Sequence, residues 1–208
     1  MTSFMQQPIA EASRQVPHWL QSVQARGLTN WGKLSLPTRR TENWKYTSLG
    51  ALRDDYRLAE ATSTPPDALP EALRQGFGGP RLVFVDGAFQ SSLSDLRDIS
   101  GLSLCRFEDA SAEQAARIAE HLDGSFDPQE HPFAALNTAT LRDGVFVEIE
   151  RDAVIDETLH VLWLVRAADA PTATSQRLLL LAGANSRVSL VEQFATIGGA
   201  EASFCSGV

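Results

Sequence analysis

The sequence predicts a mainly β protein with an α-rich N-terminal region. Apolar residues recur at helical spacing between Ala12 and Val23. From Val145 onward, short aliphatic runs alternate with Gly, Asp, Asn and Pro, which is the pattern of strands joined by turns. We therefore expect a helical region and linker in residues 1–64, a mixed α/β segment in 65–142 and a β core in 143–208.

The N-terminal helix is predicted from one apolar stripe. Pro17 lies within the stripe, so the helix either kinks there or begins there with proline in its first turn. Gly27 is the expected C-terminal stop, because glycine readily adopts the left-handed conformation that ends many helices. The stripe consists of Ala12, Val16, Trp19, Leu20 and Val23.

The middle of the chain combines a linker, two strands and two helices. Residues 60–70 contain three prolines and few groups to bury, which is typical of a linker. Arg81–Val85, which runs into Asp86-Gly87, and Leu102–Phe107 are predicted strands. Ser111 and Gln114 form a capping box at the start of a helix that buries Ala115, Ile118, Ala119 and Leu122 and ends at Gly124. His131–Leu141 is a second short helix, stopped by Asp143-Gly144.

The C-terminal part contains strands with no helix of useful length between them. This excludes ordinary crossovers between parallel strands. An antiparallel sandwich and a β-helix of stacked short strands both remain open, and apolar runs such as Leu159–Val165 somewhat favour the β-helix because they suit burial on both faces. The predicted strands are Val145–Glu150, Leu159–Val165, Arg177–Leu181 and Arg187–Ala195.

The last residues, Glu201–Val208, resemble a further strand more than a closing cap. Stacked repeats normally end in a distinct capping element. We therefore expect a longer protein of which this chain is a part. An uncovered last strand would also allow self-association.

Composition narrows the classes of function. A formal charge of −8 argues against nucleic-acid binding and against anionic lipid surfaces. The longest apolar stretches are far shorter than the ~20 residues that span a bilayer, and Met1–Pro8 does not resemble a secretory signal. We therefore expect a cytoplasmic protein. Cys105 and Cys205 lie far apart without a C-x-x-C spacing, which indicates two isolated thiols.

The histidines and the glycine-rich segment do not predict a site. His18, His121, His131 and His160 lack the i, i+4 or H-x-H spacing of a metal pair, so we expect surface or packing roles. The segment 76–79 precedes a strand, whereas a phosphate-binding loop opens a helix.

Two glutamates carry the alternative enzymatic hypothesis. Glu148 and Glu150 alternate with Val147 and Ile149, which places both on one strand face, roughly 6–7 Å apart. That separation borders on the range for acid/base pairs that cleave glycosidic bonds. A solvated strand face is the commoner outcome. The alternatives are thus a β-helix carbohydrate-active enzyme that uses these two residues, or a β-sandwich binding module.

The segment Arg39–Thr47, RRTENWKYT, is unusually dense in cations and large aromatic residues. A simple linker would not need so many cations and large aromatic residues. We expect Trp44 and Tyr46 to anchor a small helical subdomain and Arg40 to pair with Glu42.

Three stretches resemble the SufD-type proteins of iron–sulfur cluster assembly, and the SufB-type subunits less closely. The first matches L-P-x-x-R-x-E-x-W-K-Y-T through Leu36, Pro37, Arg40, Glu42, Trp44, Lys45, Tyr46 and Thr47. The second is Leu82–Phe89, followed by Leu93-Ser94, and the third is Pro132–Val147 with its L-N-x-A and D-G elements. The stretches occur in the family's order.

This resemblance implies a helical region, then a right-handed parallel β-helix, then a C-terminal helical domain. It also implies a non-catalytic scaffold that pairs with a SufB-like subunit and a SufC-like ATPase, and that aids cluster building and iron supply. The family's cluster-building and ATPase contacts lie in the half that has no counterpart here. We therefore predict no catalytic, cofactor-binding or metal-binding residue and no cofactor for this chain alone; clusters and ATP would be handled through the partner subunits.

Overall fold

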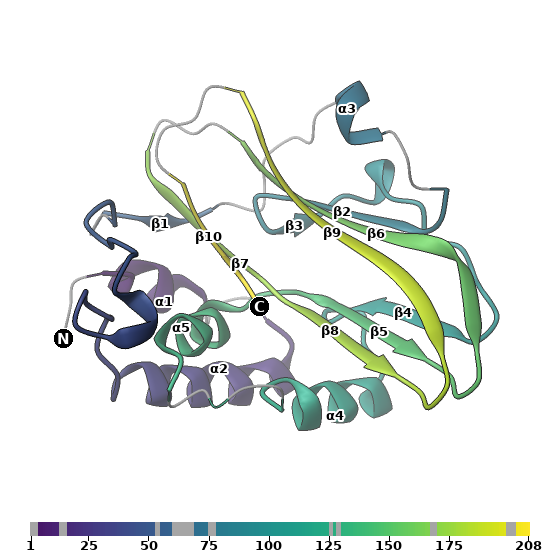
Figure 1. The fold of residues 1–208 in the computed structure, drawn as a ribbon, viewed down its shortest axis with the longest axis horizontal. Coiled ribbons are helices and arrows are strands. Elements are labelled where there is room, and N and C mark those ends of the chain that lie inside the picture. The colour runs from purple at the N-terminus through teal and green to yellow at the C-terminus, as the bar shows by residue number, and fades with distance from the viewer. Residues whose placement is uncertain are drawn as a thin grey trace.

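The computed structural model describes residues 4–12, 16–52, 55–59, 69–74, 78–124, 127, 130–166, 170–198 and 203–208. The fold is mixed α/β, with helices α1, α2, α4 and α5 grouped along one side of the strands (Figure 1). The helices among these residues are α1 (Gln6–Ala12), α2 (His18–Trp31), α3 (Glu71–Arg74), α4 (Ala112–His121) and α5 (Pro132–Thr140), with short 3-10 turns η1 (Glu42–Trp44) and η2 (Ser91–Leu93). The strands are β1 (Arg57–Leu58), β2 (Arg81–Val85), β3 (Ala88–Phe89), β4 (Leu102–Arg106), β5 (Val145–Ile149), β6 (Val154–Arg166), β7 (Thr172–Gln176), β8 (Leu178–Ala182), β9 (Arg187–Ile197) and β10 (Ser203–Gly207).

In the described part of the chain the strands form three sheets. Their orders are β1-β7-β10, β3-β2-β6-β9 and β4-β5-β8. Only the β2–β3 and β4–β5 pairs are antiparallel among the pairings between these strands. The sheets therefore combine strands from the segment 65–142 with strands from 143–208, while the predicted domain boundaries themselves stay a prediction.

The strands after Val145 visit the three sheets twice in the same order. We call β5, β6 and β7 the first coil, and β8, β9 and β10 the second coil. Each strand of the second coil pairs in parallel with the strand three places earlier: β8 with β5, β9 with β6 and β10 with β7. The antiparallel sandwich is therefore wrong, and the pairing is compatible with a parallel β-helix.

The core lies between the sheets and also under the helices. Side chains from alternate positions of β6, including Leu159, Val161 and Trp163, meet Val145 and Val147 of β5 in the interior of the coils. The intervening Leu162 and Leu164 pack against Leu69, Val83 and Val85 on the other side of β6. Burial on both faces explains why β6 contains a nearly continuous apolar run.

Helices α2 and α4 cover the outer face of the β4-β5-β8 sheet. Leu20 and Val23 of α2 and Ile118 of α4 form one buried cluster with Phe146 of β5, and Leu179 of β8 packs against it. The capping box of α4 is present as predicted, with the Ser111 hydroxyl accepting from the Gln114 amide at 3.2 Å.

The predicted end of the first helix is wrong. Helix α2 begins directly after Pro17, which agrees with one of the two predicted roles for that proline, but it continues past Gly27 to Trp31. Gly27 is needed for a close helix crossing, because a Cβ atom there would lie 2.5 Å from the backbone nitrogen of Ala139 in α5. Glycine at this position therefore serves packing and not termination.

The strand β7, with the sequence TATSQ, was not predicted, because it is short and polar and contains no aliphatic run. The predicted linker 60–70 falls mostly on residues outside the described ranges, although Leu69 is described and buried.

No helix in the described ranges is long and apolar enough to cross a membrane.

Candidate functional site

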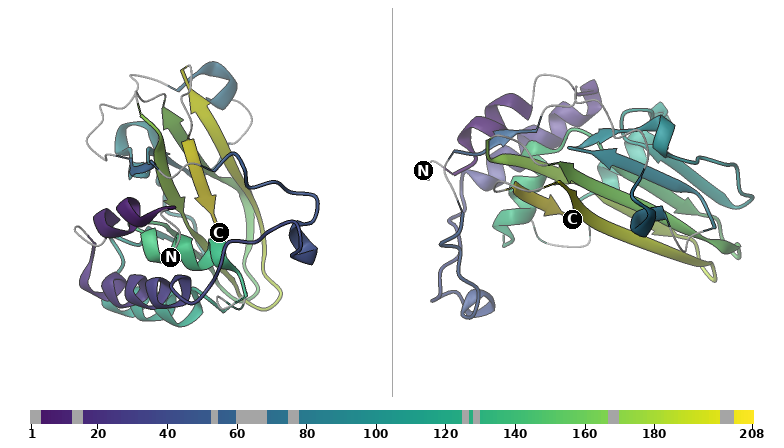
Figure 2. Two further views of the ribbon diagram at one scale, coloured as in Figure 1. Left: turned by 90° about the vertical axis from the view of Figure 1, so that its left-hand side faces the viewer. Right: turned by 90° about the horizontal axis from the view of Figure 1, so that it is seen from above.

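Residues 38–50, which we call the arm, carry the dense segment identified in the sequence and project from the body of the molecule (Figure 2). The arm is attached through Trp44, whose ring lies 5.2 Å from the ring of Phe133 in α5. Tyr46 does not anchor anything: its exposed fraction is 92%. Arg40 and Glu42 are exposed, and the described contacts include no ion pair between them. The expected anchoring role of Tyr46 and the expected ion pair between Arg40 and Glu42 are therefore both wrong.

The exposed surface of the arm is cationic and aromatic. Arg39, Arg40 and Lys45 face solvent beside Tyr46, while Glu42 is the single acidic residue of the arm. The Lys45 ammonium lies 5.3 Å from the centre of the Tyr46 ring. Arginine and tyrosine are enriched in protein interfaces. This arrangement suits a contact with an acidic protein surface.

The second and third motif stretches meet at a polar cavity of about 260 Å³. Asp86 and Gly87 make the turn between β2 and β3 with φ angles of 52° and 82°, as a two-residue hairpin turn requires. Gly87 of this turn and the adjacent Phe89 line the cavity together with Arg142 and Asp143, which follow α5. The two motif stretches are thus neighbours in space.

Asp143 is held by three hydrogen bonds at this cavity. Its Oδ1 atom accepts from the Gly144 amide at 2.8 Å and from the Glu108 amide at 3.1 Å, and its Oδ2 atom accepts from Arg106 Nη1 at 3.3 Å. Burial raises the pKa of Asp143 to about 6, although the two amides and the Arg106 guanidinium oppose that shift. Arg106 is also bound by Glu108 and by Asp109. The carboxylate therefore connects the loop that contains Glu108 to the loop that contains Gly144. Such bonds indicate a structural role for Asp143.

The two glutamates of the enzymatic alternative differ in their surroundings. Glu148 lies in β5 and accepts a hydrogen bond from Arg117 Nη2 at 2.5 Å. Glu150 lies beyond the end of β5, where it is exposed and its amide donates to the Gly101 carbonyl. Glu148 is therefore engaged by an ion pair with Arg117, and the carbohydrate-cleaving alternative stays a prediction.

The histidines and cysteines differ in burial: His160 is buried, whereas His18, His131 and Cys205 are exposed. In the described ranges no group of three His, Cys, Asp or Glu residues is arranged to hold a metal ion. His160 is buried, its Nε2 atom lies 3.0 Å from Gln193 Oε1, and burial lowers its pKa. Both cysteines are free, and burial raises the pKa of Cys105 to about 11 and raises that of Cys205 as well. Their thiolates are therefore scarce at neutral pH.

The sequence analysis missed a buried polar network that joins the helices to the coils. Arg177 is 1% exposed, and its guanidinium donates to Asn137 Oδ1 at 3.0 Å, to the Leu122 carbonyl at 3.0 Å and to Thr138 Oγ1 at 2.7 Å. Asn137, from the third motif stretch, also donates to the carbonyl of Ser206 in β10 at 2.6 Å. The asparagine within that stretch was the only signal of the network in the sequence.

Comparison with known proteins agrees with the three motif stretches. The sequence model described as "SufBD protein N-terminal region" matches residues 2–161. An iron–sulfur cluster assembly SufBD family protein of Synechocystis sp. is 31% identical over 173 residues, which cover 80% of this chain and 37% of the relative. The iron–sulfur cluster assembly protein SufD of Escherichia coli is 37% identical over 92 residues, which cover 44% of this chain and 20% of the relative.

The matched segments span well under half the length of either relative. The family match itself extends from the N-terminal helices through β5 and into β6, so it includes the arm, the polar cavity and the start of the first coil. On this evidence the chain belongs to the SufBD family of iron–sulfur cluster assembly proteins.

Proposed function

We propose that this chain serves as the N-terminal part of a SufD-like scaffold subunit that has no catalytic activity of its own. The observation that carries the proposal is the parallel pairing of each strand of the second coil with the strand three places earlier. Together with family membership, this pairing supports a right-handed parallel β-helix as the frame of the subunit. The relative named as SufD in Escherichia coli supports the SufD-like assignment.

The proposed partners are a SufB-like subunit and a SufC-like ATPase. Strands β8, β9 and β10 each lie at the end of their sheet in the described structure, so one side of each has backbone groups available for pairing. Further coils of the whole protein would use these edges. The SufB-like subunit would pair with the continuation of the β-helix, and the ATPase would bind the C-terminal domain.

The chemistry of the described residues supports a framework role. Glu148 is held by Arg117, Asp143 is held by two amides and Arg106, and Cys105 has a high pKa. Nascent clusters and their iron are therefore proposed as cargo of the assembled complex, and ATP as a ligand of the partner ATPase. A cytoplasmic location stays a prediction.

Co-purification tests this proposal. The whole protein would be co-expressed with the SufB-like and SufC-like proteins of the same organism, with an affinity tag on the SufC-like subunit only. We expect all three proteins to elute together in fixed proportions. Reproducible absence of this chain from the eluate would contradict the proposal.

The isolated chain offers a second test of the non-catalytic role. We expect no ATP hydrolysis and no stoichiometric iron or zinc after purification. One tightly held metal equivalent per chain, measured by elemental analysis, would contradict that expectation.

A further inference from the structure

Positive charge is concentrated in the arm and in the residues just before it. Residues 33–50 include both lysines of the chain, Lys33 and Lys45, together with Arg39 and Arg40, and they contain a single carboxylate, that of Glu42. The chain as a whole has a formal charge of −8. The arm is therefore a cationic element on an acidic protein.

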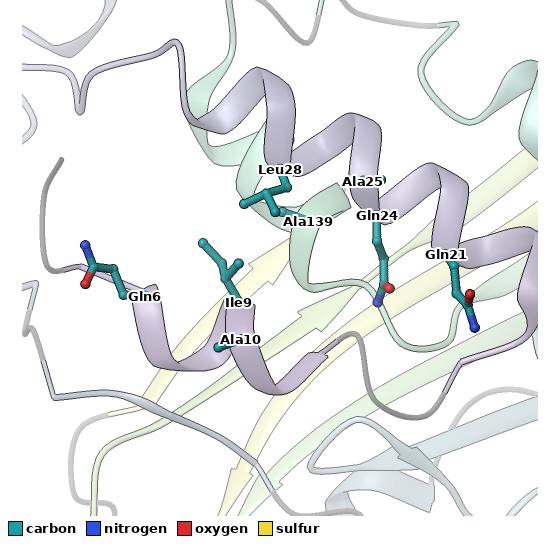
Figure 3. Close-up of a pocket in the computed structure, with 8 residues that line it drawn as sticks. All are labelled: Gln6, Ile9, Ala10, Gln21, Gln24, Ala25, Leu28 and Ala139. Atoms are coloured by element: carbon teal, nitrogen blue, oxygen red, sulfur yellow. The ribbon is translucent and has the colours of Figure 1, made fainter.

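The groove between helices α1 and α2, which precede the arm, is uncharged (Figure 3). None of the residues that line it carries a charge, and the buried amide of Gln24 donates to the carbonyls of Ala12 and Leu141. This groove offers no cation to an acidic ligand. The cationic surface instead begins with the exposed Lys33 and continues through the arm.

The cations of the arm have no carboxylate partners in the described part of the chain. Arg39, Arg40 and Lys45 are exposed, and no ion pair among the described residues includes them. By contrast, eight arginines of the body lie in ion pairs with carboxylates, among them Arg106 and Arg177. Charges that the protein itself does not neutralise remain available to a partner of opposite sign.

Hydrogen bonds within the arm fix the spacing of its cations. The Thr41 amide donates to the Thr38 carbonyl at 2.9 Å, and the Lys45 amide donates to the Glu42 carbonyl at 3.2 Å. The Arg40 amide donates to Thr38 Oγ1 at 3.2 Å. Because the backbone of the arm is already ordered, a partner would bind it at a lower entropic cost than it would bind a free segment.

We propose that the arm docks a carboxylate-rich segment of a partner protein. Acidic side chains of the partner would pair with Lys45 and with Arg39 and Arg40, whose planar guanidinium groups suit contacts with both oxygens of a carboxylate. Tyr46, which is 92% exposed, would pack against the apolar stems of those side chains. Each exposed ion pair contributes little by itself, so the affinity depends on several pairs that form together.

A nucleic acid fits the arm less well than an acidic protein segment. The four cations of residues 33–50 would neutralise few phosphates, and the net charge of the chain opposes the approach of a long polyanion. Tyrosine and arginine side chains are enriched in interfaces between proteins. The arm includes no residue of the coils, so this proposal is independent of the scaffold role.

A pair of matched peptides tests the inference. The intact chain would be titrated into a rhodamine-labelled peptide in which glutamate alternates with alanine, and into the same peptide with glutamine in place of glutamate. We expect fluorescence anisotropy to show binding of the glutamate peptide only. That binding should weaken between about 50 mM and about 500 mM salt, because salt screens exposed charges. Equal binding of the two peptides, or binding of neither, would overturn the proposal.

Charge reversal tests whether the arm itself makes the contact. Arg39→Glu combined with Arg40→Glu should weaken binding of the glutamate peptide by about tenfold, because two attractions become repulsions. Arg151→Glu combined with Arg187→Glu changes the net charge equally at exposed positions of the body, and it should weaken binding by less than about threefold. Equal effects of the two double variants would overturn the proposal. If the arm variant does not fold, replacement of the same two pairs by glutamine decides the question in the same way.

The position of the bound peptide provides a further test. In the ¹⁵N-labelled chain, the glutamate peptide should shift the backbone amide signals of Lys45 and Tyr46. The signals of Ala10 and Ala25, which line the uncharged groove, should stay unchanged. Shifts in the groove without shifts in the arm would overturn the proposal.

The class of partner is tested by competition. A single-stranded RNA and vesicles that contain phosphatidylserine would be compared with the glutamate peptide at the same salt concentration. We expect the peptide to bind more tightly than either. Tighter binding of the RNA or of the vesicles would assign the arm to another class of partner and would overturn the proposal.

Discussion

The ring of Trp44 lies 5.2 Å from the ring of Phe133, with an angle of 39° between the two planes. Trp44 belongs to the arm and Phe133 to helix α5, so the contact joins the first motif stretch to the third. Phe133 lies in turn 6.2 Å from Phe204 of β10. A chain of aromatic contacts thus runs from the exposed arm to the second coil, and the tryptophan of the motif is explained as the attachment point of the arm.

Removal of this attachment should release the arm at a modest cost in stability. We expect Trp44→Ala to lower the free energy of unfolding by about 1 kcal/mol, because Trp44 is partly buried and loses one aromatic pair. Tyr46→Ala is the control, and since Tyr46 is 92% exposed it should change stability by less than about 0.5 kcal/mol. Urea unfolding of the two variants checks this. Equal effects of the two substitutions would contradict the assigned roles.

The crossing of α2 over α5 should not tolerate a methyl group at Gly27. Alanine favours helices by up to about 1 kcal/mol over glycine, yet its Cβ atom would lie 2.5 Å from the Ala139 nitrogen. We expect Gly27→Ala to destabilise the protein by about 1–3 kcal/mol because the helices must move apart. Gly32→Ala is the matched control: its Cβ atom would come no closer than 3.4 Å to a neighbour, and φ there is −63°.

The two glycine variants are compared by thermal and urea unfolding. Gly32→Ala should be neutral or slightly stabilising. A Gly27→Ala variant as stable as Gly32→Ala would show that the close approach of α2 to α5 is absent.

Loss of the buried guanidinium of Arg177 should be far more damaging. Arg177→Met would leave Asn137 Oδ1 and the Leu122 carbonyl without their donors inside the protein. We expect a loss of about 3–5 kcal/mol in unfolding free energy. Arg187→Met is the control, because Arg187 is 75% exposed and its ion pair with Asp156, at 3.7 Å, should contribute less than about 1 kcal/mol.

The same unfolding measurement decides between two roles for Arg177. A small effect, similar to that of Arg187→Met, would mean that the network between the helices and the coils does not hold them together. A large effect that Arg177→Lys fails to rescue would support the need for several fixed donors.

Asp143 should make the protein less stable as pH rises. Burial raises the pKa of Asp143 from 3.8 to about 6 in the folded chain. Between these two values the folded state binds more protons than the unfolded state, so the contribution of Asp143 to stability is greatest below about pH 4 and falls until pH passes about 6. The fall corresponds to about 3 kcal/mol for a shift of roughly two pH units.

The Asp143→Asn variant isolates this effect, because it lacks the titrating group. The difference in unfolding free energy, variant minus wild type, should increase by about 2.5 kcal/mol between pH 4 and pH 7. Urea unfolding at several pH values measures it. A pH-independent difference would show that Asp143 has an ordinary pKa in the folded protein.

Local sequence patterns predicted much of the fold. The capping box at Ser111, the turn at Asp86-Gly87 and the strand at Arg81–Val85 depend on neighbours in sequence, and the structure confirms them. The strand β7 depends instead on its partners β1 and β10, and its own residues show no strand pattern. The role of Gly27 within α2 depends on its close approach to α5, which lies more than a hundred residues away in sequence.

The site residues were harder to predict for the same reason. The motif stretches identified the arm and the family, but composition could not show that Tyr46 is exposed while Trp44 is attached. The roles of Gln24 and Arg177 depend on carbonyls contributed by distant segments, including those of Leu141 and Leu122. No sequence pattern marks a single polar residue within an apolar stretch as the donor of a hydrogen bond to a distant carbonyl.

The iron content of the assembled complex tests the scaffold role most directly. SufB-like and SufC-like subunits would be produced with and without the whole protein that contains this chain, and iron and acid-labile sulfide would be measured per complex. We predict that both rise when the whole protein is present. Equal iron and sulfide in the two preparations would contradict the proposed function.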